Sequence, residues 1–249
     1  MNRISFLDLE FDSPSEAEVE RWLTTRSASS SFAYVVTPNV DHMVRLARVD
    51  ADLRHAYTNA DLCLCDSRVL ARLARFTNVH LGVVPGSDIV AALFDRVLNP
   101  DDTICVIGMS AKHIADLAHK YSEIVILHHS PPMGLRHDHN ARAEAVKFAL
   151  EAKARFTLLA VGSPQQELLA WEMHQAGASL GTALCIGASI DFLVGAQRRA
   201  PQFVRRLGIE WAWRLFTQPR RLARRYLIDG PAIFPMVWQW RKAQLANNK

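Results

Sequence analysis

Three polar side chains follow two apolar segments of the chain and could act together on a hydroxyl group. Asp66 comes directly after Leu62–Cys65, and Thr37 and Asn39 stand at the end of the apolar segment 32–37. A carboxylate can serve as the general base that removes the proton of a sugar hydroxyl. The other two groups would lie beside it if the segments are neighbouring strands. Asp66 could instead cap the helix that begins just after it, but the cluster of three favours a catalytic site.

A second polar turn is formed by the segment 162–167, Gly-Ser-Pro-Gln-Gln-Glu. Ser163 is predicted to cap a helix here, and Glu167 adds a favourable charge in the first helical turn. This capping could be its whole role. The alternative is that free backbone N–H groups, Gln165 or Gln166 meet a diphosphate or a sugar hydroxyl. We favour a sugar, because the Glu167 carboxylate would oppose a phosphate.

Other strand ends offer further candidate binding residues, including a turn that could hold a nucleotide phosphate. In a parallel sheet, ligands bind where strands end and loops enter helices. Gly108, Ser110 and Asp191 fall at such turns. The chain has no Gly-x-Gly-x-x-Gly and no Gly-Lys-Ser/Thr motif, which argues against a dinucleotide dehydrogenase and a P-loop enzyme.

No metal or other cofactor is predicted. Asp50-Ala51-Asp52 resembles the Asp-x-Asp motif of metal-dependent glycosyltransferases, but it falls in a helical pattern instead of a turn after a strand. The histidines between residues 128 and 139 are separated by two prolines and lack the spacing of metal ligands.

Positive charge and tryptophan are concentrated at the C-terminal end. Residues 198–249 contain 12 Lys or Arg against two acids, whereas the remainder of the chain has a net charge of −6. Four of the six tryptophans lie in the same stretch. Arginine binds phosphate with two hydrogen bonds and tryptophan favours the membrane interface, so we expect this end to dock on an anionic membrane. The alternatives are a solvated basic surface and a patch that binds nucleic acid. Our prediction is that the protein does not bind nucleic acid.

Short apolar segments alternate with helical patterns through residue 195, which predicts an α/β fold with a Rossmann-like, mostly parallel sheet and helices on both faces. The predicted strands are Phe32–Thr37, Leu62–Cys65, Thr103–Gly108, Ile124–His128, Phe156–Gly162 and Thr182–Gly187. The predicted helices lie near 40–56, 67–76, 87–98, 111–121, 140–153 and 165–176.

The change of pattern near Ala200 predicts two parts: an α/β catalytic body in residues 1–199 and a helical, membrane-associating appendage in residues 200–249. No apolar segment is long enough to span a membrane, and the start of the chain does not resemble a signal peptide. The four cysteines lie in apolar segments, as expected of buried thiols in a reducing compartment. We therefore predict a cytoplasmic protein on the inner face of the cell membrane.

An ordered set of motifs makes the chain similar to the WecG/TagA/CpsF glycosyltransferases, which build bacterial surface polysaccharides and teichoic-acid linkage units. The motifs extend from about residue 30 to residue 230. They are Thr37-Pro38-Asn39, the segment 60–66, Pro85-Gly86-Ser87-Asp88, the segment 130–134, the segment 161–167, the segment 187–192, Arg199-Ala200-Pro201, the segment 210–215 and the segment 219–226.

The resemblance implies an inverting transfer, without a metal, from a nucleotide-linked sugar, usually a UDP sugar, to a sugar on a polyprenyl diphosphate. It implies that Asp66 is the general base, with Thr37 and Asn39 beside it, and that Gln166 contacts a sugar. It also implies that three arginines of the appendage close over the site and bind a diphosphate: Arg214, Arg221 and Arg224.

Two positions depart from the family pattern. Ser67 stands where a glycine often follows the catalytic aspartate, and Val83 stands near where an arginine is common. Phosphate contacts and donor preference could differ accordingly. The alternatives to a glycosyltransferase are a non-enzymatic α/β module that binds nucleic acid and a nucleotide-sugar epimerase. The sugars, the linkage and homo-oligomer formation are left open.

Overall fold

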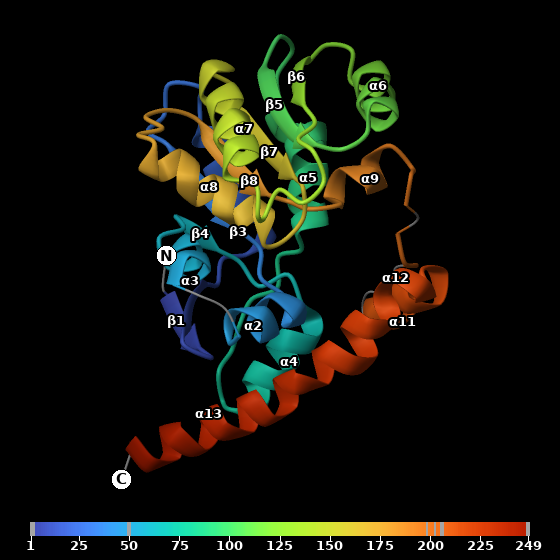
Figure 1. The fold of residues 1–249 in the computed structure, drawn as a ribbon. Helices are drawn as coiled ribbons and strands as arrows, with labels where there is room; N and C mark the ends of the chain where they lie inside the picture. Colours follow the sequence, from blue (N-terminus) through green and yellow to red (C-terminus); the bar gives the residue numbers. More distant parts are fainter. Residues whose placement is uncertain (1–2, 49–50, 198, 202, 205–206, 248–249) are drawn as a thin grey trace.

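The computed structural model describes residues 3–48, 51–197, 199–201, 203–204 and 207–247 (Figure 1). Its centre is a six-stranded parallel sheet of order β4-β3-β8-β7-β5-β6. The strands are β3 (Ala33–Val36), β4 (Leu62–Cys63), β5 (Thr103–Gly108), β6 (Val125–His129), β7 (Phe156–Ala160) and β8 (Thr182–Cys185). All six predicted strands and the α/β class are confirmed.

Alternate residues of the central strands point into two separate cores. Cys105 and Ile107 belong to one hydrophobic cluster, whereas Ile104 and Val106 belong to the other. Both faces of the sheet are therefore buried, as parallel sheets require. The helices that flank it are α2 (Val40–Leu46), α3 (Ala51–Thr58), α4 (Arg68–Phe76), α5 (Gly86–Ala92) continued by the π-helix η1 (Leu93–Val97), α6 (Ala111–Lys120), α7 (His139–Glu151), α8 (Gln165–Gln175) and α9 (Ser189–Leu193).

Residues 3–25 form elements that the sequence patterns do not predict. β1 (Arg3–Phe6) and β2 (Leu9–Asp12) make an antiparallel hairpin, and α1 (Glu16–Thr25) follows with a capping box at Ser15. Phe6 and Phe11 of the hairpin are fully buried in the first core cluster. The hairpin therefore extends the core beyond the central sheet.

The C-terminal end is helical, as predicted. It contains α11 (Glu210–Thr217), α12 (Pro219–Ala223), the π-helix η2 (Arg224–Asp229), the 3-10 helix η3 (Gly230–Ala232) and α13 (Ile233–Asn247). Figure 1 shows α13 running below α2 and α4 and past the hairpin. Trp240 packs edge-on against Phe6 with ring centroids 5.3 Å apart, and Ile233 and Val237 join the first core cluster. The C-terminal helices are thus packed against the body, and the boundary near Ala200 stays a prediction.

Two other features bear on the predictions from the sequence. All four cysteines are buried and unbridged, as expected. None of the helices in the described ranges combines the length and apolar character that crossing a membrane requires.

Candidate active site

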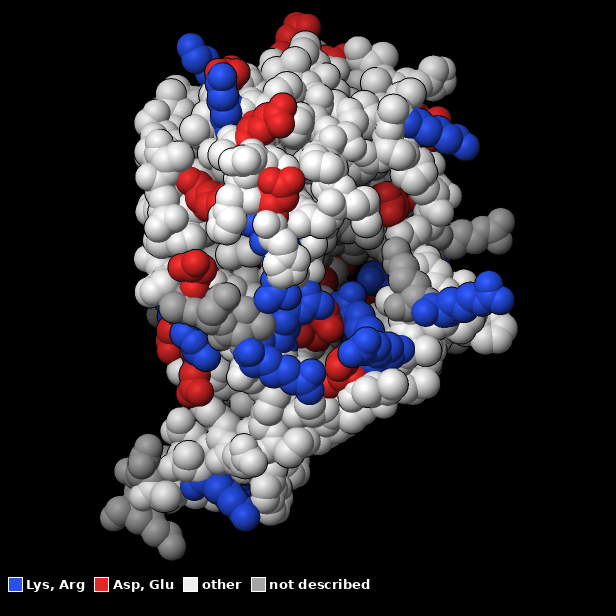
Figure 2. Space-filling model, in the orientation of Figure 1, with Lys and Arg blue, Asp and Glu red and all other residues white. Residues whose placement is uncertain are grey.

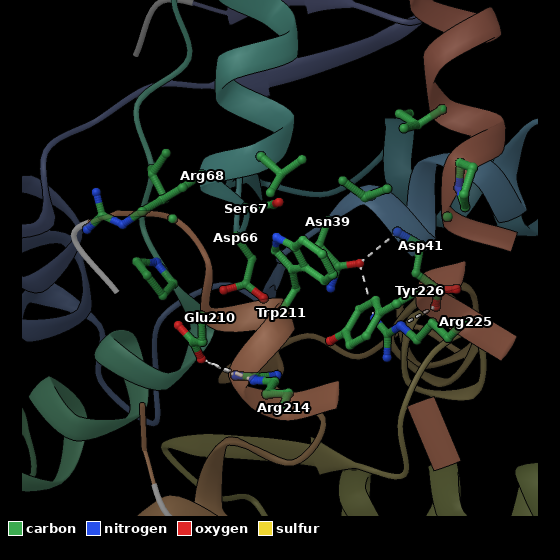
Figure 3. A pocket seen from close by; sticks show the side chains of 18 of the residues that line it. Asn39, Asp41, Asp66, Ser67, Arg68, Glu210, Trp211, Arg214, Arg225 and Tyr226 are labelled. Carbon is green, nitrogen blue, oxygen red and sulfur yellow. Dashed lines mark hydrogen bonds and ion pairs between the residues drawn. The ribbon is translucent and has the colours of Figure 1, made fainter. Parts of the chain in front are cut away.

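A pocket of about 290 Å³ lies where β3 and β4 end and the C-terminal helices approach the sheet. Its walls come from the loops that enter α2 and α4, from Val83 to Ser87, and from α11, η2 and α13. Figure 3 shows Asp66 facing this space, with Arg214 and Arg225 on its other sides. The carboxyl ends of parallel strands are where ligands bind in this class of sheet.

The backbone around Asp66 fixes its carboxylate in the pocket wall. The amide of Gly86 donates a hydrogen bond to Asp66 Oδ1 at 3.0 Å, and the amide of Asp66 donates to the carbonyl of Pro38 at 3.0 Å. Ser67, not Asp66, caps α4, because its hydroxyl accepts from the amide of Leu70 at 3.2 Å. The carboxylate is therefore not used as a helix cap and is available to a substrate.

Burial raises the pKa of Asp66 from its ordinary value to about 6. The loss of hydration outweighs the charge of Arg214, the Gly86 amide and the Asn39 side chain, all of which favour the ionised form. Glu210 adds to the rise by repulsion. A carboxylate with such a pKa is ionised near neutral pH and is a stronger base than an exposed aspartate, which suits a general base.

Asn39 and Thr37 lie next to Asp66, because β3 and β4 pair in parallel. The Asn39 side chain caps α2 by accepting from the amides of Asp41 and His42. Thr37 is buried, and its hydroxyl donates to the carbonyl of Cys185 at 3.2 Å. Thr37 is thus beneath the pocket, whereas Asn39 lines it.

Gly86 allows this close arrangement. A Cβ atom at Gly86 would lie 3.3 Å from the hydroxyl oxygen of Thr37 and 3.5 Å from that of Ser189. A side chain at this position would therefore crowd Thr37, whereas Gly86 leaves its N–H group free to hold Asp66.

Arginines from the C-terminal helices form the opposite wall. Arg214 pairs with Glu210 at 2.7 Å, and its guanidinium lies over the Phe192 ring. Arg225 donates to Asn39 at 3.3 Å and lies 3.4 Å from Asp41. Figure 2 shows Lys and Arg side chains gathered around a hollow at this place, with acidic side chains between them. The pocket therefore presents one candidate base and at least two cations.

The structure does not bring Arg224 to the pocket. Its side chain is 84% exposed and lies 3.7 Å from Asp229. Arg221 belongs to α12, but its side chain lies outside the described part of the structure. Arg225 lines the pocket and was not predicted, because helical spacing alone does not anticipate that Arg224–Asp229 forms a π-helix.

The Gly162–Glu167 turn differs from its prediction in one respect. Pro164 occupies the cap position of α8 without a side-chain hydrogen bond, so the prediction that Ser163 is the cap is wrong. The Ser163 carbonyl instead accepts from Arg45 at 2.5 Å. Gln165 turns its side-chain amide toward the carbonyls of the same turn.

Gln166 is buried and engaged at both ends of its amide. Its Nε2 group donates to Glu167 at 2.7 Å, and its Oε1 atom accepts from the amide of Gly187 at 2.8 Å. It therefore joins the turn after β7 to the turn after β8, and a sugar contact would require one of these bonds to open. Glu167 is fully buried, and burial raises its pKa.

Gly108, Ser110 and Asp191 gather at a second place, away from Asp66. The connection after β5 leads outward to β6 and the connection after β7 leads the other way to β8, so these adjacent strands form a topological switch point. Ser110 caps α6 here, and Gly108 adopts a φ of 101°. Asp191 lies 3.6 Å from His113 of α6. These groups form a candidate nucleotide site, distinct from the base pocket.

The residues considered for metal binding do not form a cluster. Within the described ranges, no group of three or more His, Cys, Asp or Glu side chains is placed to hold a metal ion. Asp50 of the Asp-x-Asp segment lies outside these ranges. The predicted absence of a metal or cofactor stays a prediction.

Residues that the patterns did not select complete the pocket. Trp211, Tyr226 and Phe234 contribute aromatic surface, and Asp41 links Arg225 to Arg45. No local spacing marks them, because they come from separate elements that meet only in the folded chain. The basic, tryptophan-rich composition of the C-terminal end was the available signal.

A doubly covered parallel sheet with a carboxylate and facing arginines at its carboxyl edge is compatible with a group-transfer enzyme. Residues 4–247 match the model of the Glycosyl transferase WecG/TagA/CpsF family, and the chain belongs to that family. It is therefore a glycosyltransferase of cell-surface polymer synthesis. Family membership argues against the alternatives of a binding module and an epimerase.

Proposed function

We propose that the protein transfers a hexosyl or N-acetylhexosaminyl group from a UDP-linked sugar to a sugar carried on polyprenyl diphosphate. The observation that carries the proposal is the Asp66 carboxylate, held by the Gly86 amide in a pocket whose far wall is Arg214 and Arg225. Such a pocket suits an acceptor hydroxyl next to a diphosphate.

The proposed reaction is a single displacement with inversion. Asp66 takes the proton of the acceptor hydroxyl as its oxygen attacks the anomeric carbon of the donor sugar. The bond from that carbon to the diphosphate oxygen breaks, and the electron pair leaves with the nucleoside diphosphate. Arg214, whose guanidinium lies over the ring of Phe192, the neighbour of Asp191, would offset the negative charge that develops on the leaving group.

The donor nucleotide is proposed to bind at the switch point between β5 and β7. The Gly108–Ser110 turn opens toward the N-terminus of α6, and backbone N–H groups at such a turn favour phosphate. Asp191 would accept from a ribose or sugar hydroxyl. The sugar would then extend toward the Gly162–Glu167 turn and Asp66.

The lipid-linked acceptor is proposed to reach the pocket from a membrane surface on which the C-terminal helices dock. Phe234, Trp238 and Leu245 are each more than half exposed and recur along one side of α13. Lys242 lies over the Trp238 ring at 5.3 Å. Aromatic side chains with neighbouring cations suit the interface of an anionic bilayer. The resulting location would be peripheral, on the cytoplasmic face.

The test is transfer by the Asp66→Asn variant. Purified protein would be supplied with a panel of nucleotide sugars and a polyprenyl-diphosphate-linked N-acetylhexosamine, with products read by mass. We expect the wild-type enzyme to add one sugar residue with a UDP donor, and the variant to lose at least about 10²-fold in kcat. Near-normal turnover by a folded variant would refute the role of Asp66. Turnover of the donor with no acceptor would refute the transfer reaction.

A further inference from the structure

The outer face of α4, in the α/β body, is strongly cationic. Arg68, Arg72 and Arg75 recur at intervals of four and three residues and lie on one side of the helix. All three are exposed, whereas Leu70 and Ala74 on the opposite side are buried in the core. The helix contains no acidic residue. Among the described residues, none of the three arginines forms an ion pair.

This face of α4 is continuous with the exposed apolar side of α13. The guanidinium of Arg241 lies over the Phe76 ring at 4.5 Å, and Phe76 is 55% exposed. On a helical projection Arg241 falls between Val237, which faces the core, and the exposed Phe234. Figure 1 shows α4 directly beside α13. Phe76 therefore borders the exposed stripe of α13.

The chain before α11 continues the same surface on the other side of α4. Gly208 packs so closely on α4 that an added Cβ would lie 3.0 Å from Arg72 and 3.2 Å from Arg68. The neighbouring Leu207 and Ile209 are 56% and 40% exposed. Exposed apolar side chains thus flank the arginines of α4 on both sides.

The base pocket opens at the edge of this surface. Arg68 and Val69 of α4, Gly208 and Phe234 all line the pocket as well as bordering the cationic face. Figure 3 shows Arg68 directed away from Asp66, toward the rim. The entrance of the pocket between α4 and α13 therefore lies on the same face of the molecule as the exposed apolar and cationic side chains. A substrate that enters there would approach from this face.

We propose that α4 is a membrane-docking element of the catalytic body, so that an anionic bilayer contacts α4 and α13 together and faces the mouth of the Asp66 pocket. The inference rests on the proposed function and extends it from the C-terminal helices to the body. A bilayer fits because three unpaired arginines match anionic headgroups, and exposed Phe76, Phe234 and Trp238 match the interfacial layer beneath them.

The experiment compares vesicle binding of full-length variants. Arg72→Glu/Arg75→Glu changes the charge of the α4 face without altering a pocket residue, and Lys112→Glu/Lys147→Glu on α6 and α7 is the matched control. Sedimentation would use phosphatidylcholine vesicles with and without phosphatidylglycerol. We expect the α4 variant to bind anionic vesicles at least about tenfold more weakly than the wild type, and the control to bind within about twofold.

Activity separates failure of docking from failure of the proposed function. On a short-chain, water-soluble acceptor the α4 variant should match the wild type, whereas on a vesicle-borne acceptor it should be slower by the same factor as its binding. Arg72→Gln/Arg75→Gln should give an intermediate loss. Equal vesicle binding by the α4 variant and the wild type would overturn the inference, as would salt-sensitive binding to RNA without binding to vesicles. Absence of transfer by the wild type would instead count against the proposed function.

Discussion

Asp66 is held in an environment that favours its neutral form, although catalysis needs the ionised form. Its pKa in the folded protein is about 6, above the value of about 3.9 in an unfolded chain. The folded state therefore binds the proton more tightly, and stability falls as pH rises from about 4 to about 6. Above that range the ionised carboxylate lowers the free energy of unfolding.

Asp66→Asn should consequently stabilise the protein at neutral pH. The expected gain in the free energy of unfolding is about 1–2 kcal/mol near pH 7.5 and close to zero near pH 4, after allowance for partial exposure of the side chain. Urea denaturation of both proteins at the two pH values measures it. An equal effect at both values would contradict the raised pKa.

The pKa of Asp66 also sets the pH below which kcat/KM falls, which is the acid limb of the pH profile. Because the base must be ionised, kcat/KM should fall about tenfold per pH unit below about pH 6. Arg214→Gln should move this limb to higher pH, since the charge of Arg214 favours the carboxylate. The measurement is kcat/KM with a soluble acceptor between about pH 5 and pH 8. A limb that does not move would show that Arg214 does not act on Asp66.

Glu167 is expected to matter as a buried hydrogen-bond acceptor. Burial raises its pKa, and one carboxyl oxygen accepts from Gln166. Glu167→Ala leaves that donor unpaired beside a cavity and should cost about 2–4 kcal/mol in the free energy of unfolding. Glu167→Gln keeps the shape and should cost less than about 1 kcal/mol. Thermal denaturation distinguishes them, and equal losses would contradict this account.

At the scale of elements, Ser67 shows how one departure from the family pattern acts locally. Its hydroxyl caps α4, so Ser67→Ala should cost about 1 kcal/mol of stability and Ser67→Gly only a few tenths. Both variants should keep kcat within about threefold, because Gly86 and Asn39 still hold Asp66. A large loss of kcat in Ser67→Gly would assign the hydroxyl a role in substrate binding.

The central sheet was predictable because its strands are apolar on both faces and are separated by helical patterns. The N-terminal hairpin was not. Its turn, Leu7-Asp8, has positive φ at both residues but lacks the Asn-Gly type of sequence that usually marks such a turn. Buried Phe6 also pairs with residues far along the chain, which no local pattern contains.

The site was predictable where it depends on strand ends and less so where it depends on the C-terminal helices. Neighbouring strands place Asn39 beside Asp66, as the patterns indicate. The π-helix η2 sets which arginine faces the pocket, and its register cannot be read from helical spacing. The place of Arg225 in the pocket is therefore known only from the structure.

At the scale of the whole molecule, the N-terminal hairpin and the last helix of the chain pack against each other. Trp240 of α13 packs on Phe6 of β1, whereas Trp238 on the same helix is 53% exposed. If the C-terminal helices are part of one cooperative unit, Trp240→Ala should lower the free energy of unfolding of the entire protein by about 2–3 kcal/mol. Trp238→Ala, the matched control, should change it by less than about 0.5 kcal/mol.

Two signals followed together decide whether this coupling exists. Circular dichroism reports the helical content, and hydrogen exchange at the amides of β5 reports the sheet. Hydrogen exchange is preferable to a fluorophore on Cys105, because a label at that buried position would perturb the core. In Trp240→Ala, α13 and β5 should lose protection by the same free energy, because Ile233 and Val237 share a core with Cys105 and Ile107. Loss of protection in α13 alone would show instead that the segment after Ala200 unfolds as a separate appendage.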